Sequence, residues 1–139
     1  MQNLTELAQQ FFIRDRFAGA TTGVRIVEAE PGHAICELLV DERHLNAAGV
    51  VMGGALFTLA DMASSVAANI EAVSMERHNE LFLSLNCQIN YLKASRGGLL
   101  TATAHCVKSG RTTCLYNVDI TDEKDILIAT FQTTGIRTI

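Results

Sequence analysis

The stretch Gly53–Val73, GGALFTLADMASSVAANIEAV, decides the architecture that the rest of the chain must adopt. From Ala55 onward it is rich in Ala, Leu and Met and contains no Pro, which favours a helix of about five turns. Apolar residues fall on nearly every face of this helix, so other parts of the protein are expected to cover it almost all round.

The residues after this helix have strand patterns. From Leu81 to Tyr91 the hydrophobic period is two, and alternation predicts that Leu81, Leu83, Leu85, Cys87, Ile89 and Tyr91 face one side and Ser84, Asn86, Gln88 and Asn90 the other. Three further strands are predicted, two of them joined at Ser109-Gly110, over Leu99–Lys108, Thr112–Ile120 and Ile126–Thr134.

The residues before the helix predict a short amphipathic helix and a hairpin. Helical spacing of apolar residues covers Leu4–Phe17, and strand-like runs at Gly23–Ala29 and His33–Val40 flank a Pro-Gly turn. An antiparallel sheet of about six strands curled around the long helix is the simplest way to cover it. The sequence therefore predicts an α+β fold in a single domain, residues 1–139.

Composition narrows the range of functions. The chain has 139 residues, of which 48% are hydrophobic, and a formal net charge of −4. This hydrophobic fraction is high for so short a chain, which favours self-association. The net negative charge provides no positive potential to attract nucleic acid or an anionic membrane, so neither is an expected partner. No leader-like segment is present, so a cytoplasmic location is expected. The four cysteines are not spaced as zinc ligands are, so we predict that they are small core residues and bind no metal. They are Cys36, Cys87, Cys106 and Cys114.

Asp61 is a carboxylate within the most apolar segment of the chain. Desolvating an ionised carboxylate is costly, so such a residue is usually paired, placed at a surface or used in catalysis. One interpretation places Asp61 on an exposed stripe with Ser64, Ser65 and Asn69. The other makes it a base or nucleophile with a raised pKa.

Gly54 lies where the irregular loop becomes the long helix. The first turn of a helix carries unpaired N–H groups, and two consecutive glycines let a substrate carbonyl approach them, as in an oxyanion hole. A plain loop-to-helix junction is the alternative. Asp61 follows seven residues later, ~10.5 Å along the helix on nearly the same face, too far for one carbonyl to meet both groups. Two antiparallel helices related by a two-fold axis would bring the pair together.

These residues resemble the signature of the PaaI-like branch of the hotdog-fold acyl-CoA thioesterases, in the string His44-x-Asn46-x-x-Gly49-x-x-x-Gly53-Gly54-x-x-x-x-x-x-Asp61. The likeness extends to the order of helices and strands over nearly the whole chain. It implies a hotdog fold, a homodimer or a dimer of dimers, and an acyl-CoA substrate. No cofactor is expected, since coenzyme A enters as part of the substrate.

The resemblance also assigns roles to individual residues. It implies that Gly54 N–H polarises the thioester carbonyl and that Asp61 of the partner chain is the nucleophile or the base for water. Asn46 would hold the carbonyl or the water, and Ser84 would assist the water. Most members have His directly before the two glycines, whereas this chain has Met52, which cannot donate a hydrogen bond. His44 is a candidate to replace that histidine in part, with a solvated loop residue as the alternative.

Coenzyme A phosphates are usually bound by basic side chains and backbone amides. The candidates lie after the long strand and around the Gly110 turn: Lys93, Arg96, Lys108, Arg111 and Thr112. With Gly53 and Met52 beside the carbonyl, they complete the predicted substrate site. The acyl group stays open among arylacetyl, hydroxybenzoyl and medium-chain groups, because the side chains expected to set the tunnel length are unplaced: Phe57, Leu59, Met62 and Phe82.

Other functions are less well supported. A non-catalytic acyl-CoA binding or sensing module would use the same pocket, and Met52 makes that alternative relevant. Hotdog hydratases use an Asp/His pair in a loop pattern that this chain lacks. No GxSxG elbow of a serine hydrolase occurs, and no glycine motif for dinucleotides or nucleoside triphosphates follows a predicted strand.

Overall fold

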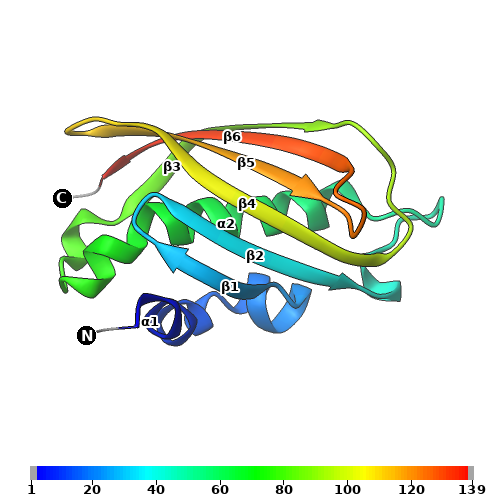
Figure 1. Cartoon of the computed structure of the whole chain (residues 1–139), viewed down its shortest axis with the longest axis horizontal. Helices are drawn as coiled ribbons and strands as arrows, with labels where there is room; N and C mark the ends of the chain where they lie inside the picture. Colours follow the sequence, from blue (N-terminus) through cyan, green and yellow to red (C-terminus); the bar gives the residue numbers. More distant parts are fainter. Residues whose placement is uncertain (1–2, 138–139) are drawn as a thin grey trace.

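The computed structural model describes residues 3–137 and places one long helix against a six-stranded antiparallel sheet (Figure 1). The helix, α2 (Gly53–Ser74), lies along the concave side of the sheet. The spatial order of the strands is β1-β2-β4-β5-β6-β3. Their bounds are β1 Arg25–Glu30, β2 His33–Val40, β3 Phe82–Tyr91, β4 Gly98–Ser109, β5 Thr113–Thr121 and β6 Leu127–Arg137. The predicted α+β architecture, a sheet wrapped around one central helix, is confirmed.

Small residues on the sheet let α2 pack closely. Ala29 pairs with Ala34, which pairs with Ala104, and Cys36 pairs with Ala102 on the next rung. All five side chains are buried beneath the helix side of the sheet. Larger side chains from β4, β5 and β6 fill the space on either side, and the buried residues form one continuous cluster.

The four cysteines behave as core residues. All are free thiols; Cys36 and Cys114 are buried, and the other two are half-buried. Burial raises the pKa of the Cys36 thiol to about 12, so the thiolate needed for redox or nucleophilic chemistry does not form there. Cys36 and Cys114 are therefore small core residues, as predicted, and Cys87 and Cys106 pack against the same core.

The N-terminal segment differs from the single predicted helix. It forms α1 (Leu4–Phe11), a 3-10 turn η1 (Phe12–Arg14) and a π-helical segment η2 (Phe17–Thr22). Ala8 and Phe12 are buried against the core, and η2 ends at a glycine with positive φ. The chain changes direction after η1, which lets η2 approach the start of α2. Among the described residues, no helix combines the length and apolar character needed to cross a membrane.

Strand β3 forms one edge of the sheet, and the predicted alternation of its side chains is wrong in its first half. The pairing of β3 with β6 shifts register between Ser84 and Asn86, so Leu85 forms a bulge. Ser84 therefore faces the same side as Cys87, since the hydroxyl of buried Thr133 contacts both. Leu83 and Leu85 are instead 56% and 66% exposed.

Candidate active site

Helix α2 has one stripe that its own chain does not cover. Gly54 and Asp61 are exposed, and Thr58 and Ser65 are half-buried, at spacings of four, three and four residues. That spacing places all four on one helical face. Most of the remaining residues of α2 are buried, so this stripe is where a ligand or a second chain can reach the helix.

Gly54 lies at the second position of α2, where its N–H group has no acceptor within the helix. A Cβ built on Gly54 would meet no atom within 4 Å, so the space beside this amide is open. A cavity of about 320 Å³ occupies that space. Its lining comes from η2, the preceding loop and the first turn of α2: Phe17, Thr21, Thr22, Arg43, His44, Met52, Gly54, Ala55 and Thr58.

Asp61 lies one helical turn beyond Thr58 and does not line that cavity. Surrounding protein atoms still remove enough water to raise the pKa of its carboxyl group, and the negative charge of Asp15 raises it further. Desolvation also raises the pKa of Asp15, against the opposing effect of Arg14. A carboxylate with a raised pKa is a stronger base toward water than an ordinary surface aspartate. The interpretation of Asp61 as a solvated member of a polar stripe fits less well, because Ser64 and Asn69 are buried.

Asp15 is a contributor to this site that the sequence reasoning missed. It follows η1 and is far from Asp61 in the sequence. No local pattern connects two carboxylates at such a separation; only the packing of the N-terminal segment on α2 brings their charges together.

The loop before α2 is held by Asn46. Its side-chain oxygen accepts hydrogen bonds from the backbone N–H groups of Ala48 at 2.9 Å and Val50 at 3.2 Å. The backbone N–H of Asn46 donates to the carbonyl of Val50 at 2.8 Å. No hydrogen bond of its Nδ2 group occurs within residues 3–137.

His44 is buried, at 4% exposure, rather than solvated in the loop. Its Nδ1 accepts a hydrogen bond from the backbone N–H of Asp41 at 2.9 Å, and its Nε2 lies 2.6 Å from the carbonyl oxygen of Thr22. Its own carbonyl accepts from the N–H of Met52 at 2.8 Å. Both ring nitrogens are therefore engaged by backbone groups.

Met52 is the N-cap of α2 and makes no side-chain hydrogen bond to the helix. Its side chain is 54% exposed and lines the cavity. Gly53 has a packing role, because a Cβ there would lie 2.8 Å from the ring of Tyr91. The two glycines thus differ, since Gly54 faces open space and Gly53 faces a side chain.

Ser84 lies away from the polar face on which it was predicted. Its hydroxyl accepts a hydrogen bond at 2.9 Å from the hydroxyl of Thr133, which is fully buried. Ser84 is nevertheless exposed, and it lies in β3, an edge strand of the sheet.

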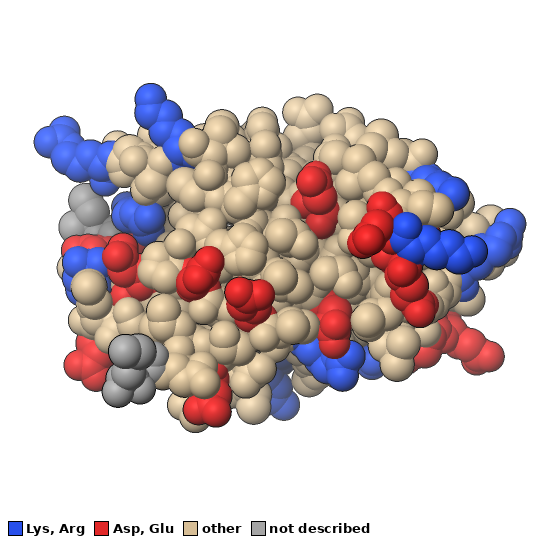
Figure 2. All heavy atoms as spheres, in the orientation of Figure 1, with Lys and Arg blue, Asp and Glu red and all other residues tan. Residues whose placement is uncertain are grey.

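The basic candidates fall into two separate groups within one chain. Arg96 lies beside the loop before α2, with Nη1 3.9 Å from the position of a Cβ on Gly49, and Lys93 lies near Asp122 in the same region. Lys108, Arg111 and Thr112 belong to the β4–β5 hairpin, at the opposite end of the sheet from the start of α2 (Figure 1). On the face seen in Figure 2, acidic side chains occupy the middle and most basic ones lie toward the ends.

The side chains expected to set the length of an acyl tunnel are dispersed. Leu59 is fully buried in the core, Phe57 packs edge-on against Phe131 at 5.2 Å, and Phe82 packs against Tyr116 at 5.7 Å. Met62 lines a second cavity of about 430 Å³ between the N-terminal segment and β1. Met62 therefore lines a cavity beside the start of β1, apart from the one beside Gly54.

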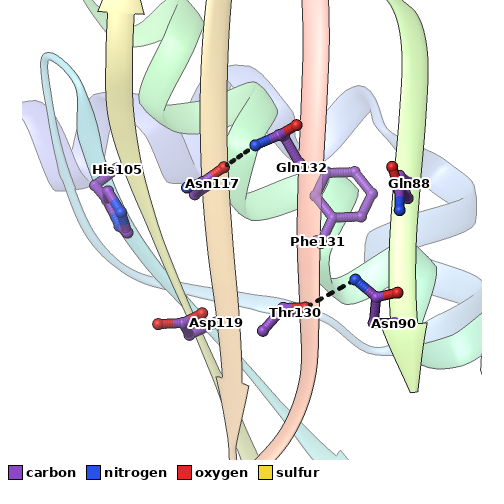
Figure 3. A pocket seen from close by; sticks show the side chains of 8 residues that line it. All are labelled: Gln88, Asn90, His105, Asn117, Asp119, Thr130, Phe131 and Gln132. Carbon is purple, nitrogen blue, oxygen red and sulfur yellow. Dashed lines mark hydrogen bonds between the residues drawn. The ribbon is translucent and has the colours of Figure 1, made fainter. Parts of the chain in front are cut away.

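A third cavity, of about 370 Å³, lies on the outer face of the sheet, with α2 behind the strands (Figure 3). Its polar side chains pair across strands: Gln132 donates to Asn117 at 2.9 Å, and Asn90 donates to Thr130 at 3.3 Å. Neither Gly54 nor Asp61 lines it. This cavity is therefore separate from the candidate active site.

A cluster with metal-ligand chemistry occurs at the β1–β2 hairpin. Potential ligand atoms of Glu28, Glu30 and His33 lie within 4.8 Å of one another. His33 Nδ1 is 3.7 Å from a carboxylate oxygen of Glu30, so the pair forms an ion pair when the histidine is protonated. None of these residues lines the cavity beside Gly54.

Comparison with known proteins identifies the family of this chain. The model of the thioesterase superfamily matches residues 48–129. The chain is 35% identical to 1,4-dihydroxy-2-naphthoyl-CoA hydrolase of Listeria monocytogenes, over 78% of this chain and 85% of that protein. It is 32% identical to human acyl-coenzyme A thioesterase 13, over 88% of this chain and 84% of that protein.

Among solved structures, the E. coli PaaI protein of the phenylacetic acid degradation operon superposes with a TM-score of 0.84. The two are 26% identical, and the match covers 98% of this chain and 96% of PaaI. The chain therefore belongs to the thioesterase superfamily, in its PaaI-like hotdog branch, and is a thioester hydrolase.

Proposed function

We propose that the protein hydrolyses the thioester of a small acyl-CoA, at two equivalent sites that each combine residues of two chains. Gly54 N–H of one chain polarises the carbonyl, and Asp61 of the other chain attacks it or activates a water molecule. The observation that carries this proposal is the uncovered stripe of α2, where Gly54 and Asp61 are both exposed on one face, two turns apart.

The dimer is supported by the edge of the sheet next to this stripe. Strand β3 has one unpaired edge and exposes Leu83, Leu85 and Tyr91. An exposed apolar edge strand favours pairing with another strand. A two-fold axis beside β3 would continue the sheet and set the two α2 helices antiparallel, with Gly54 of each chain toward Asp61 of the other. Light scattering distinguishes this dimer from a dimer of dimers.

The same two-fold arrangement would unite the two basic groups. The second chain runs in the opposite direction, so its β4–β5 hairpin lies at the end where the first chain carries Arg96. Lys93 and Arg96 of one chain and Lys108, Arg111 and Thr112 of the other would then surround the coenzyme A phosphates. Arg96→Ala and Arg111→Ala are expected to raise KM for acyl-CoA more than for an acyl-pantetheine, which lacks the nucleotide phosphates.

The chemistry requires few groups, because a thiolate leaves easily. Attack on the carbonyl breaks the C–S bond after a tetrahedral intermediate, whose oxyanion the Gly54 amide stabilises. The thiolate leaves and is protonated to coenzyme A. If water attacked, with its proton taken by Asp61, the acyl group leaves directly as the acid; if Asp61 attacked, water then hydrolyses the acyl–Asp61 anhydride to release the acid and the Asp61 carboxylate. In this proposal Asn46 donates through Nδ2 to the carbonyl or the water, and Ser84 is the candidate to orient water from the edge strand.

The acyl group is proposed to be small and largely apolar. The 320 Å³ cavity beside Gly54 is lined by Phe17, Met52 and Ala55 together with threonine side chains. An aryl or short-to-medium acyl group fits that lining, and a panel of such acyl-CoA thioesters ranks them.

The first experiment measures thiol release from that panel by the wild type and by Asp61→Ala. Hydrolysis that is lost in Asp61→Ala supports the proposal. Tight acyl-CoA binding without thiol release by the wild type would support a sensing module instead, an alternative that Met52 favours because it removes a polar group beside the carbonyl.

A subunit-mixing experiment tests the composite site. Gly54→Pro removes the N–H donor at a position in the first helical turn, where Pro is tolerated. A heterodimer of Asp61→Ala and Gly54→Pro chains, purified through two different tags, retains one complete site if the site spans two chains. It is expected to recover about half of the wild-type activity, whereas a site within one chain would leave it inactive.

A further inference from the structure

The arrangement around His44 goes beyond its expected role as a substrate ligand. A ligand or proton carrier needs a ring nitrogen that faces the substrate. Here Nδ1 accepts from the N–H of Asp41, which places the ring proton on Nε2, and Nε2–H donates to the carbonyl of Thr22. The neutral ring thus has no nitrogen left for a thioester.

His44 instead connects three segments that surround the cavity. Through Nε2 it holds the end of η2, which contributes Phe17 and Thr22 to the cavity wall. Through Nδ1 it holds the turn after β2. Through its carbonyl it holds the N–H of Met52, the residue that caps α2 two positions before Gly54.

The backbone around it leaves little freedom for another arrangement. Leu45 forms an isolated antiparallel bridge with Val51, so the loop leaves His44 and returns beside it. A shift of the ring would move this bridge and the first turn of α2 together. The direction of the Gly54 N–H depends on that turn.

We infer that His44 is a positioning residue: it belongs to the wall of the cavity, aligns the Gly54 amide with the η2 wall, and makes no hydrogen bond to the substrate through its ring nitrogens. This inference rests on the proposed function, because it gives the Gly54 amide a catalytic purpose. Misplacing an oxyanion donor by about 1 Å can lower the rate of the chemical step by up to ~100-fold, while ground-state binding changes little.

Two conservative variants separate the two ring contacts. His44→Gln keeps a donor near Thr22 and loses the acceptor for Asp41, whereas His44→Asn keeps the acceptor and loses the donor. Each is expected to lower kcat about 10- to 100-fold and to leave KM within about threefold. The matched control is His105→Gln, on the outer face of the sheet, which is expected to leave both constants unchanged.

A rise in KM with unchanged kcat would overturn the inference in favour of direct substrate contact, and unchanged constants in both variants would remove any role. Nitrogen-15 spectra of the wild-type ring supply a readout that does not need activity: the neutral Nε2–H tautomer is expected, and a protonated or Nδ1–H ring would contradict it. If the wild type hydrolyses no thioester, the proposed function fails. The ring tautomer and the displacement of the Gly54 amide signal in the two variants then decide the inference about His44.

Discussion

The hydroxyl of Tyr91 donates a hydrogen bond to the carbonyl oxygen of Gly53 at 3.1 Å, which joins the end of the edge strand to the first residue of α2. A Cβ on Gly53 would lie 2.8 Å from this ring. A Cβ on Gly135 would overlap the carbonyl oxygen of Leu83 and the ring of Phe82. The same substitution therefore meets a movable side chain at one glycine and fixed backbone at the other.

We expect Gly53→Ala to change the free energy of unfolding by less than about 1 kcal/mol, because half-exposed Tyr91 can rotate away and the lost hydrogen bond is offset by helix propensity. Gly135→Ala is expected to cost at least about 2 kcal/mol, since backbone must move. Urea unfolding of the two variants measures both values. Equal losses would contradict this assignment of the contacts.

Asp61→Asn should stabilise the protein at neutral pH while it abolishes hydrolysis. The native state binds the Asp61 proton more tightly than the unfolded chain, whose pKa is near 3.8, so the free energy of unfolding falls as pH rises from that value through the raised native pKa. The variant avoids this loss. We expect the Tm of Asp61→Asn to exceed the wild-type Tm at pH 7 by about 1–3 °C, a small gain because Asp61 is partly exposed to solvent. Below pH 3.8 the two Tm values are expected to match. Asp119→Asn, on the outer face, is the control for general charge removal.

Asp15→Asn should shift the pH profile of hydrolysis. The base must be ionised, so activity falls as pH drops through the pKa of Asp61, which the charge of Asp15 raises. Removing that charge lowers the pKa of Asp61 and moves the acid limb of kcat/KM to lower pH. Initial rates across the pH range measure the shift, and Glu6→Gln on α1 serves as the control. An unmoved acid limb would show that Asp15 does not act on the catalytic base.

Met52→His should increase the rate. It introduces a hydrogen-bond donor at the position where the resemblance to the PaaI-like family implies a histidine, at a residue that lines the cavity beside Gly54. One hydrogen bond that strengthens in the transition state is worth about 1.4 kcal/mol, or a tenfold gain in kcat. Met75→His, at the exposed C-cap of the same helix, should have no effect. A decrease in kcat for Met52→His would mean that the apolar side chain is needed for substrate placement.

Ser84→Ala and Thr133→Val separate structural from catalytic roles at the edge strand. Each removes the same 2.9 Å hydrogen bond. Ser84→Ala also leaves the buried Thr133 hydroxyl without its acceptor, and Thr133→Val also removes the acceptor of the Cys87 thiol, so both should lower the free energy of unfolding by about 1 kcal/mol. Only Ser84→Ala should lower kcat, by about tenfold or more, if Ser84 orients the water. Equal kcat values in the two variants would leave Ser84 with a structural role alone.

Local patterns in the sequence determined most of the fold. The apolar run from Ala55 to Val73 predicted α2, because a helix that is apolar all round must be covered, and period-two runs predicted the strands. The spacing of Asn46, Gly54 and Asp61 identified the family. These residues are near one another in the chain, so their spacing can be read directly from the sequence. Gly54 lets a substrate approach the backbone closely, and Asp61 supplies a carboxylate at a fixed distance from it along the same helix.

Tertiary structure alone decided the features that join distant segments. The bulge at Leu85 reversed the face of Ser84, because register depends on the pairing of β3 with β6 rather than on hydrophobic period. The approach of Asp15 to Asp61 and the hydrogen bond between His44 Nε2 and the carbonyl of Thr22 follow from the packing of the N-terminal segment against α2 and the loop before it. Electrostatic and hydrogen-bond partners are set by distance in space, which a single sequence does not encode locally.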